Sequence, residues 1–165
     1  MNLIESKKIT FVLPGMSYKP SGGSKIIFQY ANCLVARGYK IKIIFTCHNS
    51  FINHHIPEVI RRMICRIFVA LFPSCKELNK KVTKKAVFDM KDDKVPTADY
   101  IVATAYETAW PVYNLDSSKG KKIYFIQDYE NWTCSNEEVE ATYNLMQNVV
   151  ISKWLKKIDD SHTDS

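Results

Sequence analysis

The chain alternates short apolar runs with segments in which apolar residues recur every three or four positions. The first run, Lys8 to Leu13 (KITFVL), is followed by a Pro-Gly pair and predicts a buried strand. From Ser24 to Gly38 the apolar residues follow helical spacing, which predicts a helix capped by Ser24 or by Ser21. Tyr39 to Cys47 alternates lysine with isoleucine and predicts a second strand. A strand, a helix and a strand in this order indicate a right-handed parallel βαβ unit.

The same alternation continues to the end of the chain. Ile56 to Phe72 predicts an amphipathic helix, and we expect the lysine-rich stretch after it to be exposed and only partly extended. Later strands are predicted at Tyr100 to Thr104, at Lys121 to Asp128 and in the segment NVVIS. Later helices are predicted near Thr108 to Tyr113, at Glu137 to Met146 and from Lys153 onward. The sum of about five strands predicts an α/β fold: a Rossmann-like, doubly wound, mostly parallel sheet with helices on both faces.

The ends of the predicted strands locate the site. In an open α/β sheet, ligands bind beyond the carboxyl ends of the strands. We therefore expect the site in the loops Pro14 to Gly23, Thr46 to His55, Thr104 to Thr108 and Gln127 to Trp132.

A pair of glycines, Gly22 and Gly23, closes the first of these loops. The order GGSK lacks the GK[ST] ending of a P-loop, and the spacing from Gly15 does not form GxGxxG. Neither an ATP-binding nor an NAD-binding loop is therefore expected. Bare backbone N–H groups at a helix N-terminus favour an anion or a hydroxyl group, which a separate domain could face. The alternative is that the two glycines only form a turn.

Composition and charge fit one globular domain. The chain has 165 residues, of which 46% are hydrophobic and 24% are charged. Its net charge of +6 suits an anionic ligand, an acidic lipid or nucleic acid. The sequence has no RNP-type aromatic pattern and no recognition-helix signature, so nucleic acid is not an expected partner.

The cysteines and the N-terminus bear on location. Five cysteines form no CxxC pair, which indicates free thiols in a reducing compartment. The N-terminus lacks a secretory signal pattern, and no apolar run reaches the roughly 18 residues of a membrane span. We therefore expect a cytoplasmic location. His48, His54 and His55 lie close together in sequence, but no acidic or thiolate ligand has the spacing to complete a site, so no metal is expected.

Four segments, in this order, resemble landmarks of GT-B glycosyltransferases of the family 4 type. They are Lys8 to Phe45, with its paired glycines and its LVARGYKIKI step, then ADYIVATAYETAW, IYFIQDYENW and VVISKWLKKI. The third segment is similar to rhamnosyltransferase-like members that build surface polysaccharides. The resemblance covers nearly the whole chain.

The resemblance implies half of a GT-B enzyme, in which two Rossmann-like domains face each other across a cleft. Residues 1–150 would form the N-terminal, acceptor-side domain. Residues 151–165, where ISKWL matches the family's linker, would lead to a C-terminal donor domain in cis or in trans. The implied activity is hexosyl or rhamnosyl transfer from a nucleotide sugar to a saccharide or lipid-linked acceptor, with no cofactor besides the donor substrate. Because the other half would stabilise the leaving diphosphate, we expect little or no activity from this chain alone.

The resemblance and the loop positions together identify candidate site residues. Asp128 and Glu130 follow the most apolar strand, and a carboxylate there could accept a proton from an acceptor hydroxyl as the catalytic base. Many relatives carry a histidine in this region, so the identity of the base stays open. The candidate substrate-binding residues are Gly22, Gly23, Thr104, Tyr106, Glu107, Gln127 and Tyr129.

Several candidates also have a purely structural interpretation. Asp128 can cap the turn that follows its strand, and Glu107 or Thr108 can cap a helix. Tyr129 and Trp132 can stack on a sugar or simply pack in the core.

The predicted helix from Ile56 to Phe72 combines arginines with a wide apolar surface. One interpretation is an ordinary core helix. The other is peripheral contact with the inner face of a membrane, in which Met63, Ile67, Phe68 and Phe72 enter the bilayer. Anionic headgroups would then meet Arg61, Arg62 and Arg66, and the lysines at positions 76, 80, 81, 84 and 85.

A function of another class also stays open. The chain could be a non-catalytic α/β binding module, or a subunit that pairs with a separate donor domain.

Overall fold

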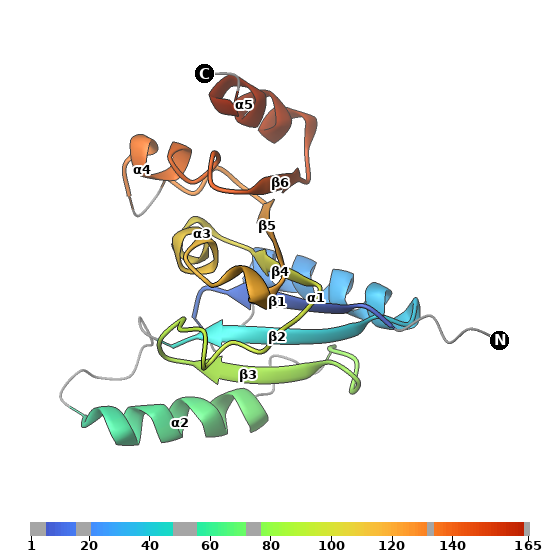
Figure 1. The fold of residues 1–165 in the computed structure, drawn as a ribbon, viewed down its shortest axis with the longest axis vertical. Coiled ribbons are helices and arrows are strands. Elements are labelled where there is room, and N and C mark those ends of the chain that lie inside the picture. The colour runs from blue at the N-terminus through green and yellow to red at the C-terminus, as the bar shows by residue number, and fades with distance from the viewer. Residues whose placement is uncertain (1–5, 16–20, 48–55, 72–76, 132–133, 164–165) are drawn as a thin grey trace.

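The structure is a computed structural model that describes residues 6–15, 21–47, 56–71, 77–131 and 134–163 (Figure 1). Within these ranges six strands form one sheet of order β3-β2-β1-β4-β5-β6, and all neighbouring strands are parallel. The strands are β1 (Lys8–Leu13), β2 (Lys40–Thr46), β3 (Thr83–Val87), β4 (Tyr100–Ala103), β5 (Lys121–Ile126) and β6 (Gln147–Val150). The helices are α1 (Gly22–Ala36), α2 (Glu58–Leu71), α3 (Tyr106–Tyr113), α4 (Asn136–Glu140), α5 (Lys153–Thr163) and the 3-10 helix η2 (Ser117–Lys119).

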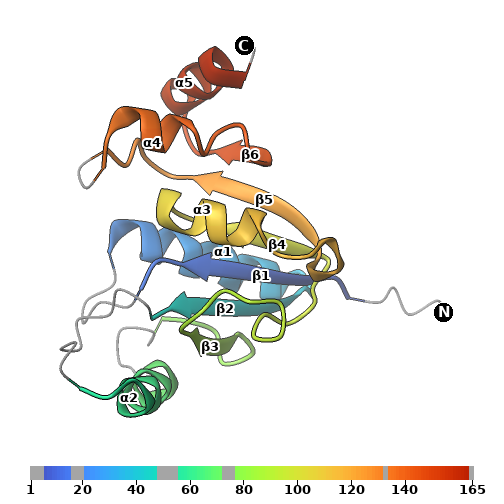
Figure 2. The ribbon, with the colours of Figure 1, turned by 60° about the vertical axis from the view of Figure 1, so that its left-hand side comes forward.

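Two hydrophobic cores lie on opposite faces of the sheet because successive strand residues point to opposite sides. Figure 2 shows α1 behind the sheet and α3 in front of it. The core on the side of α1 and α2 includes Phe11, Ile27, Ile43, Val69 and Phe125. The core on the side of α3, α4 and α5 includes Val12, Ile44, Val112, Val139 and Leu155. The prediction of a doubly wound, Rossmann-like α/β sheet is therefore confirmed.

The strand order reverses between β1 and β4. From β1 the chain adds β2 and β3 on one side, and it then returns to add β4, β5 and β6 on the other. The helices that follow these two strands, α1 and α3, lie on opposite faces of the sheet, and in doubly wound folds such a reversal is where a ligand crevice is expected, at the carboxyl ends of the strands. This crevice is where the candidate site is expected.

Helix α1 begins at the two glycines themselves. Ser21 is its N-cap, and the Ser21 hydroxyl oxygen accepts a hydrogen bond from the backbone N–H of Ser24 at 3.2 Å. Gly22 and Gly23 are thus the first helical residues, and of the two predicted caps Ser21 is confirmed. After the helix, Gly38 adopts a φ of 90°, which glycine tolerates and other residues rarely adopt.

One strand was not predicted. The segment TKKAV forms β3, which pairs with β2 from Thr83 to Val87. Its sequence lacks the apolar run of a central strand, and only Val87 of its five residues is fully buried. Lysines are common on edge strands because they discourage pairing with other chains. The lysine-rich sequence that suggested an exposed stretch is therefore the sequence of an exposed edge.

The predicted helix from Glu137 to Met146 is wrong in its length. Helix α4 ends at Glu140, and turns follow. In the first turn the buried Thr142 donates its hydroxyl hydrogen to the carbonyl of Val139 at 2.6 Å. Asn148 then donates its side-chain amide to the carbonyl of Tyr143 at 2.7 Å. The backbone bonds after Ala141 reach three residues back, as from the N–H of Thr142 to the carbonyl of Val139, in place of the four-residue bonds that would continue α4.

Candidate functional site

The start of α1 lies against the loop that follows β5. A Cβ atom added to Gly23 would lie 3.4 Å from both Nε2 and Oε1 of Gln127. The same test finds nothing within 4 Å of Gly22. The Gln127 amide therefore lies beside the backbone of Gly23, about one methyl group away.

The Gln127 amide also joins the loop that follows β4. Its Nε2 donates to the backbone carbonyl of Thr104 at 3.1 Å. Its Oε1 is buried and accepts no hydrogen bond from the described residues. Buried polar atoms rarely lack a partner, and one without a protein donor is usually met by water or by a ligand group, so Gln127 is a candidate contact for a polar ligand. Three segments far apart in sequence thus meet around Gln127.

The side chain of Thr104 is not available to a ligand at Gln127, because it is buried and already hydrogen-bonded. Thr104 is 3% exposed, and its hydroxyl donates to the carbonyl of Val12 at 2.8 Å. This bond ties the end of β4 to β1 at the strand-order reversal. Thr104 therefore contributes its carbonyl oxygen to the site, while its hydroxyl holds the two strands together.

Glu130 follows in the same loop and is half-buried. Its Oε2 accepts a hydrogen bond from the backbone N–H of Tyr106, at the start of α3, over 2.7 Å. The pKa of Glu130 is raised to about 7, chiefly by burial and in smaller part by the charges of Glu107 and Asp128, against the opposing effect of the Tyr106 N–H. A carboxyl group with this pKa can take up and release a proton near neutral pH.

Asp128 and Glu107 are more exposed than Glu130. The Oδ1 of Asp128 accepts from the backbone N–H of Tyr129 at 2.9 Å, which is the turn-capping contact of the structural interpretation. Glu107 lies in the first turn of α3, where a negative charge is favoured by the helix dipole. Both carboxylates act on the site through their charge beside Glu130.

Tyr129 turns toward the core and α4. Its ring packs against the core on the side of α3, and its hydroxyl donates to Oε1 of Glu140 at 2.5 Å. This hydrogen bond, with burial, raises the pKa of Tyr129 to about 12. Tyr129 therefore anchors the loop that carries Gln127 and Glu130 to α4.

The first turn of α1 leaves two backbone donors at the crevice. Ser21 already bonds the N–H groups of Ser24, through its side chain, and of Lys25, through its carbonyl. The N–H groups of Gly22 and Gly23 have no acceptor among the described residues. Together with the Gln127 amide and the Glu130 carboxyl, they give the crevice donors, an acceptor and a titratable group, which is a set suited to hydroxyl groups.

Two further residues hold this arrangement together: Thr108, whose predicted role as a cap of α3 is confirmed, and Glu140, which sequence reasoning missed. Thr108 is fully buried, and its hydroxyl oxygen accepts from the backbone N–H groups of Thr104 and Ala105 at 3.0 and 3.1 Å. Glu140 holds the hydroxyl of Tyr129. Thr108 was considered only as a helix cap, and nothing in the spacing of Glu140 signals a partner 11 residues earlier.

Two groups of predicted residues lie outside the described residues. They are Trp132 and the histidines 48, 54 and 55. Within the part of the chain that is described, no three or more histidine, cysteine or acidic side chains are grouped so that they could hold a metal ion. In the same part, no helix has the length and apolar character needed to cross a bilayer.

Comparison with known proteins gives no family for this chain. No family model matches it, and no curated protein matches it. Functional assignment therefore depends on the fold and on the crevice described above.

Proposed function

We propose that this chain is the acceptor-side domain of a nucleotide-sugar-dependent glycosyltransferase, of the kind that transfers a hexosyl or rhamnosyl group in surface polysaccharide synthesis. The observation that carries the proposal is that the start of α1 lies against the loop after β5 in a Rossmann-like sheet, with Gly23 beside Gln127 and the titratable Glu130 three residues further along that loop. Sugars are bound through their hydroxyl groups, and this crevice presents both donors and acceptors to such groups.

In the proposed reaction an acceptor hydroxyl attacks the anomeric carbon of the donor sugar. The new bond joins the acceptor oxygen to that carbon, the bond from the carbon to the nucleotide diphosphate breaks, and the hydroxyl proton passes to Glu130. A base works best when its pKa lies near the working pH, and the raised pKa of Glu130 meets this condition. Asp128 is the second candidate for this role, and its exposure makes it the weaker one.

The remaining residues of the crevice would position the acceptor. The Gln127 Oε1 and the N–H groups of Gly22 and Gly23 are directional partners for hydroxyl groups. Tyr106 would act through its backbone N–H, which orients Glu130. Glu107 would hold the pKa of Glu130 high by its charge.

The donor half of the reaction is assigned to a second domain, in cis or in trans. Transfer requires stabilisation of the leaving diphosphate. The proposal therefore predicts little or no transferase activity from residues 1–165 alone. It also assigns the domain to the cytoplasm, because Cys47 and Cys65 are buried free thiols, as is usual in a reducing compartment.

A competing function is a non-catalytic α/β binding module that pairs with another protein. The same crevice would then bind a small polar ligand without proton transfer. The raised pKa of Glu130 favours the catalytic proposal, because a binding module has no need of a group that titrates near pH 7.

The experiment separates sugar binding from nucleotide binding. The 165-residue chain is tested by saturation-transfer NMR with methyl glycosides of rhamnose, glucose and galactose, and separately with UDP and dTDP. We expect transfer to at least one glycoside that Gly23→Val abolishes, and no binding of either nucleotide. Tight binding of a nucleotide would contradict the proposal, because it would mean that the donor pocket lies in this domain.

A further inference from the structure

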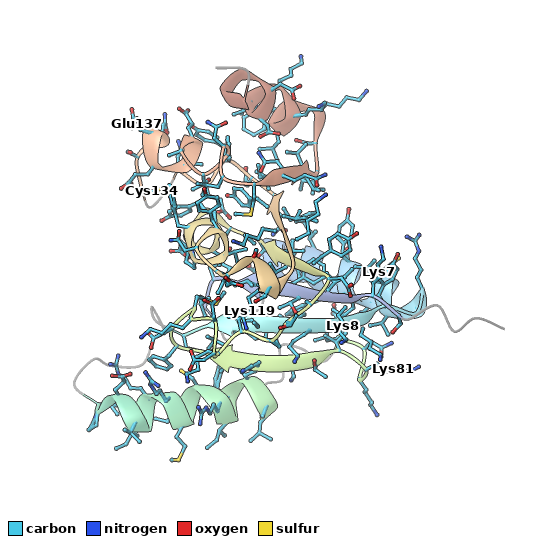
Figure 3. The ribbon with its side chains drawn as sticks, in the orientation of Figure 1. Lys7, Lys8, Lys81, Lys119, Cys134 and Glu137 are labelled. Carbon is cyan, nitrogen blue, oxygen red and sulfur yellow. The ribbon has the colours of Figure 1, made fainter. Side chains whose placement is uncertain are left out.

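Helix α2 presents a continuous apolar stripe to solvent. Val59, Met63, Ile67 and Leu71 recur every four residues, and Ile60 lies beside them on the same face. Val59 and Leu71, near the two ends of the helix, are 78% and 77% exposed. Figure 3 shows side chains of α2 projecting away from the sheet. Isolated exposed apolar residues are common, but a stripe along a whole helix marks an interaction surface.

The opposite face of α2 already has its partner. Cys65 and Val69 are buried, Val69 in the core that α2 shares with the sheet, and Cys65 beside Cys47. Arg61 and Arg62 stack over the ring of Phe88 from this side. The helix is therefore docked on the sheet, and the outer stripe is additional to the surface that folding requires.

The border of the stripe carries positive charge. Arg66 is exposed, lies one helical turn from Met63, and forms no ion pair with a carboxylate among the described residues. Lys84, on the neighbouring strand β3, donates to the carbonyl of Ala70 in the last turn of α2. The carboxylate of Glu58 is paired with Arg62 and is thereby neutralised. An apolar stripe with a cationic border is complementary to a partner that has an apolar interior beneath a layer of anionic groups.

We propose that the outer face of α2 docks on an anionic lipid bilayer, with the helix lying in the plane of the interface. Its 14 residues span about 20 Å, which is too short to cross a membrane and suits an interfacial helix. The apolar residues that enter the lipid are Val59, Ile60, Met63, Ile67 and Leu71, and Arg66 contacts the headgroups.

The structure revises which residues of α2 take part. Phe68 is half-buried on the side of the sheet, and Phe72 lies outside the described residues. Arg62 is held by Glu58 and Asp89, so it does not meet headgroups as the sequence suggested. A second copy of this chain is the competing occupant. Two stripes face to face would bring two Arg66 side chains together, and like charges oppose such pairing.

The test is co-sedimentation of the 165-residue chain with vesicles of phosphatidylcholine, with and without phosphatidylglycerol. We expect binding only to the vesicles that contain phosphatidylglycerol. The variant Met63→Glu/Ile67→Glu should abolish it, and Arg66→Gln should lower the affinity roughly fivefold. The matched control is Ile151→Glu, an exposed aliphatic residue just after β6, at the opposite edge of the sheet. These positions are exposed, so circular dichroism should show every variant folded.

Two outcomes would overturn the proposal. One is equal binding to vesicles with and without phosphatidylglycerol, or a loss of binding in Ile151→Glu as large as that in Met63→Glu/Ile67→Glu. The other is a dimer in sedimentation equilibrium that Met63→Glu/Ile67→Glu dissociates, because a second copy would then cover the stripe. No sugar enters this assay, so its result is independent of the proposed glycosyl transfer.

Discussion

The side-chain amide of Gln127 lies beside the backbone of Gly23, 104 residues earlier in the sequence, so that a Cβ at position 23 would lie 3.4 Å from both polar atoms of that amide. The first turn of α1 and the loop after β5 therefore share one surface. Gly22 beside it has open space around its Cα. This difference between two adjacent glycines provides a direct test of the site.

We predict that Gly23→Val destabilises the protein by about 1–3 kcal/mol and that Gly22→Val changes the stability by less than about 0.5 kcal/mol. The added methyl groups at position 23 must displace Gln127 and break its hydrogen bond to Thr104. Both substitutions replace glycine by the same residue in the same helical turn, so their helix propensities cancel. Urea denaturation of the two variants measures the difference. Equal stabilities would mean that Gly23 does not touch Gln127.

The raised pKa of Glu130 predicts a pH dependence of stability. Its pKa is about 7 in the folded protein and about 4.5 in the unfolded chain, so the folded state binds the proton more tightly. This contribution is present below pH 4.5 and is lost as the pH rises toward and through 7, a loss of at most about 3 kcal/mol. Glu130→Gln should remove this dependence and raise the stability at pH 8, because no buried charge then forms.

The matched control for that experiment is Glu77→Gln, which neutralises an exposed glutamate. Free energies of unfolding at pH 5 and at pH 8 should change in parallel in this control and in the native chain. If Glu130→Gln keeps the full pH dependence of the native chain, Glu130 is not the group responsible.

Glu107→Gln should lower the pKa of Glu130. The Glu107 carboxylate faces Glu130 and disfavours its ionisation, so removing that charge makes the ionised form easier to reach. Carboxyl carbon NMR across a pH titration measures the pKa directly. An unchanged pKa would show that burial alone sets it.

Thr108→Val should destabilise the protein by about 2–4 kcal/mol. Valine has the shape of threonine but removes the acceptor for the buried N–H groups of Thr104 and Ala105. The control is Thr10→Val, a buried threonine of β1 whose hydroxyl makes no hydrogen bond within the described residues. It should be nearly neutral. Thermal melts of the two variants compare them, and similar losses of stability would contradict the role given to Thr108.

The fold was largely predictable from the sequence, because most strands are short apolar runs and α1 follows the helical period. Strand β1 has the predicted limits, Lys8–Leu13. The edge strand β3 was missed because its sequence lacks an apolar run. Its backbone hydrogen bonds to β2 hold it in the sheet instead. Helix α4 was overextended because its backbone bonds shorten to a three-residue spacing after Ala141, a change that has no signature in the apolar pattern.

The site was predictable only to the level of its loops. Parallel topology brings the ends of β4 and β5 together, and this could be deduced from the order of the elements. The contact of Gly23 with Gln127 could not be deduced, since it depends on how α1 packs on the sheet. The difference between Glu130 and Asp128 also follows from packing, which leaves Glu130 half-buried and Asp128, two residues away, exposed.

The most direct test of the proposed acceptor site is a backbone amide chemical-shift map of the uniformly ¹⁵N-labelled chain, titrated with the methyl glycoside that shows the strongest saturation transfer. The proposal predicts that the largest shifts fall on Gly22, Gly23, Tyr106, Gln127 and Glu130, and that Gly23→Val suppresses them. Chemical-shift changes confined to the amino ends of the strands would contradict it.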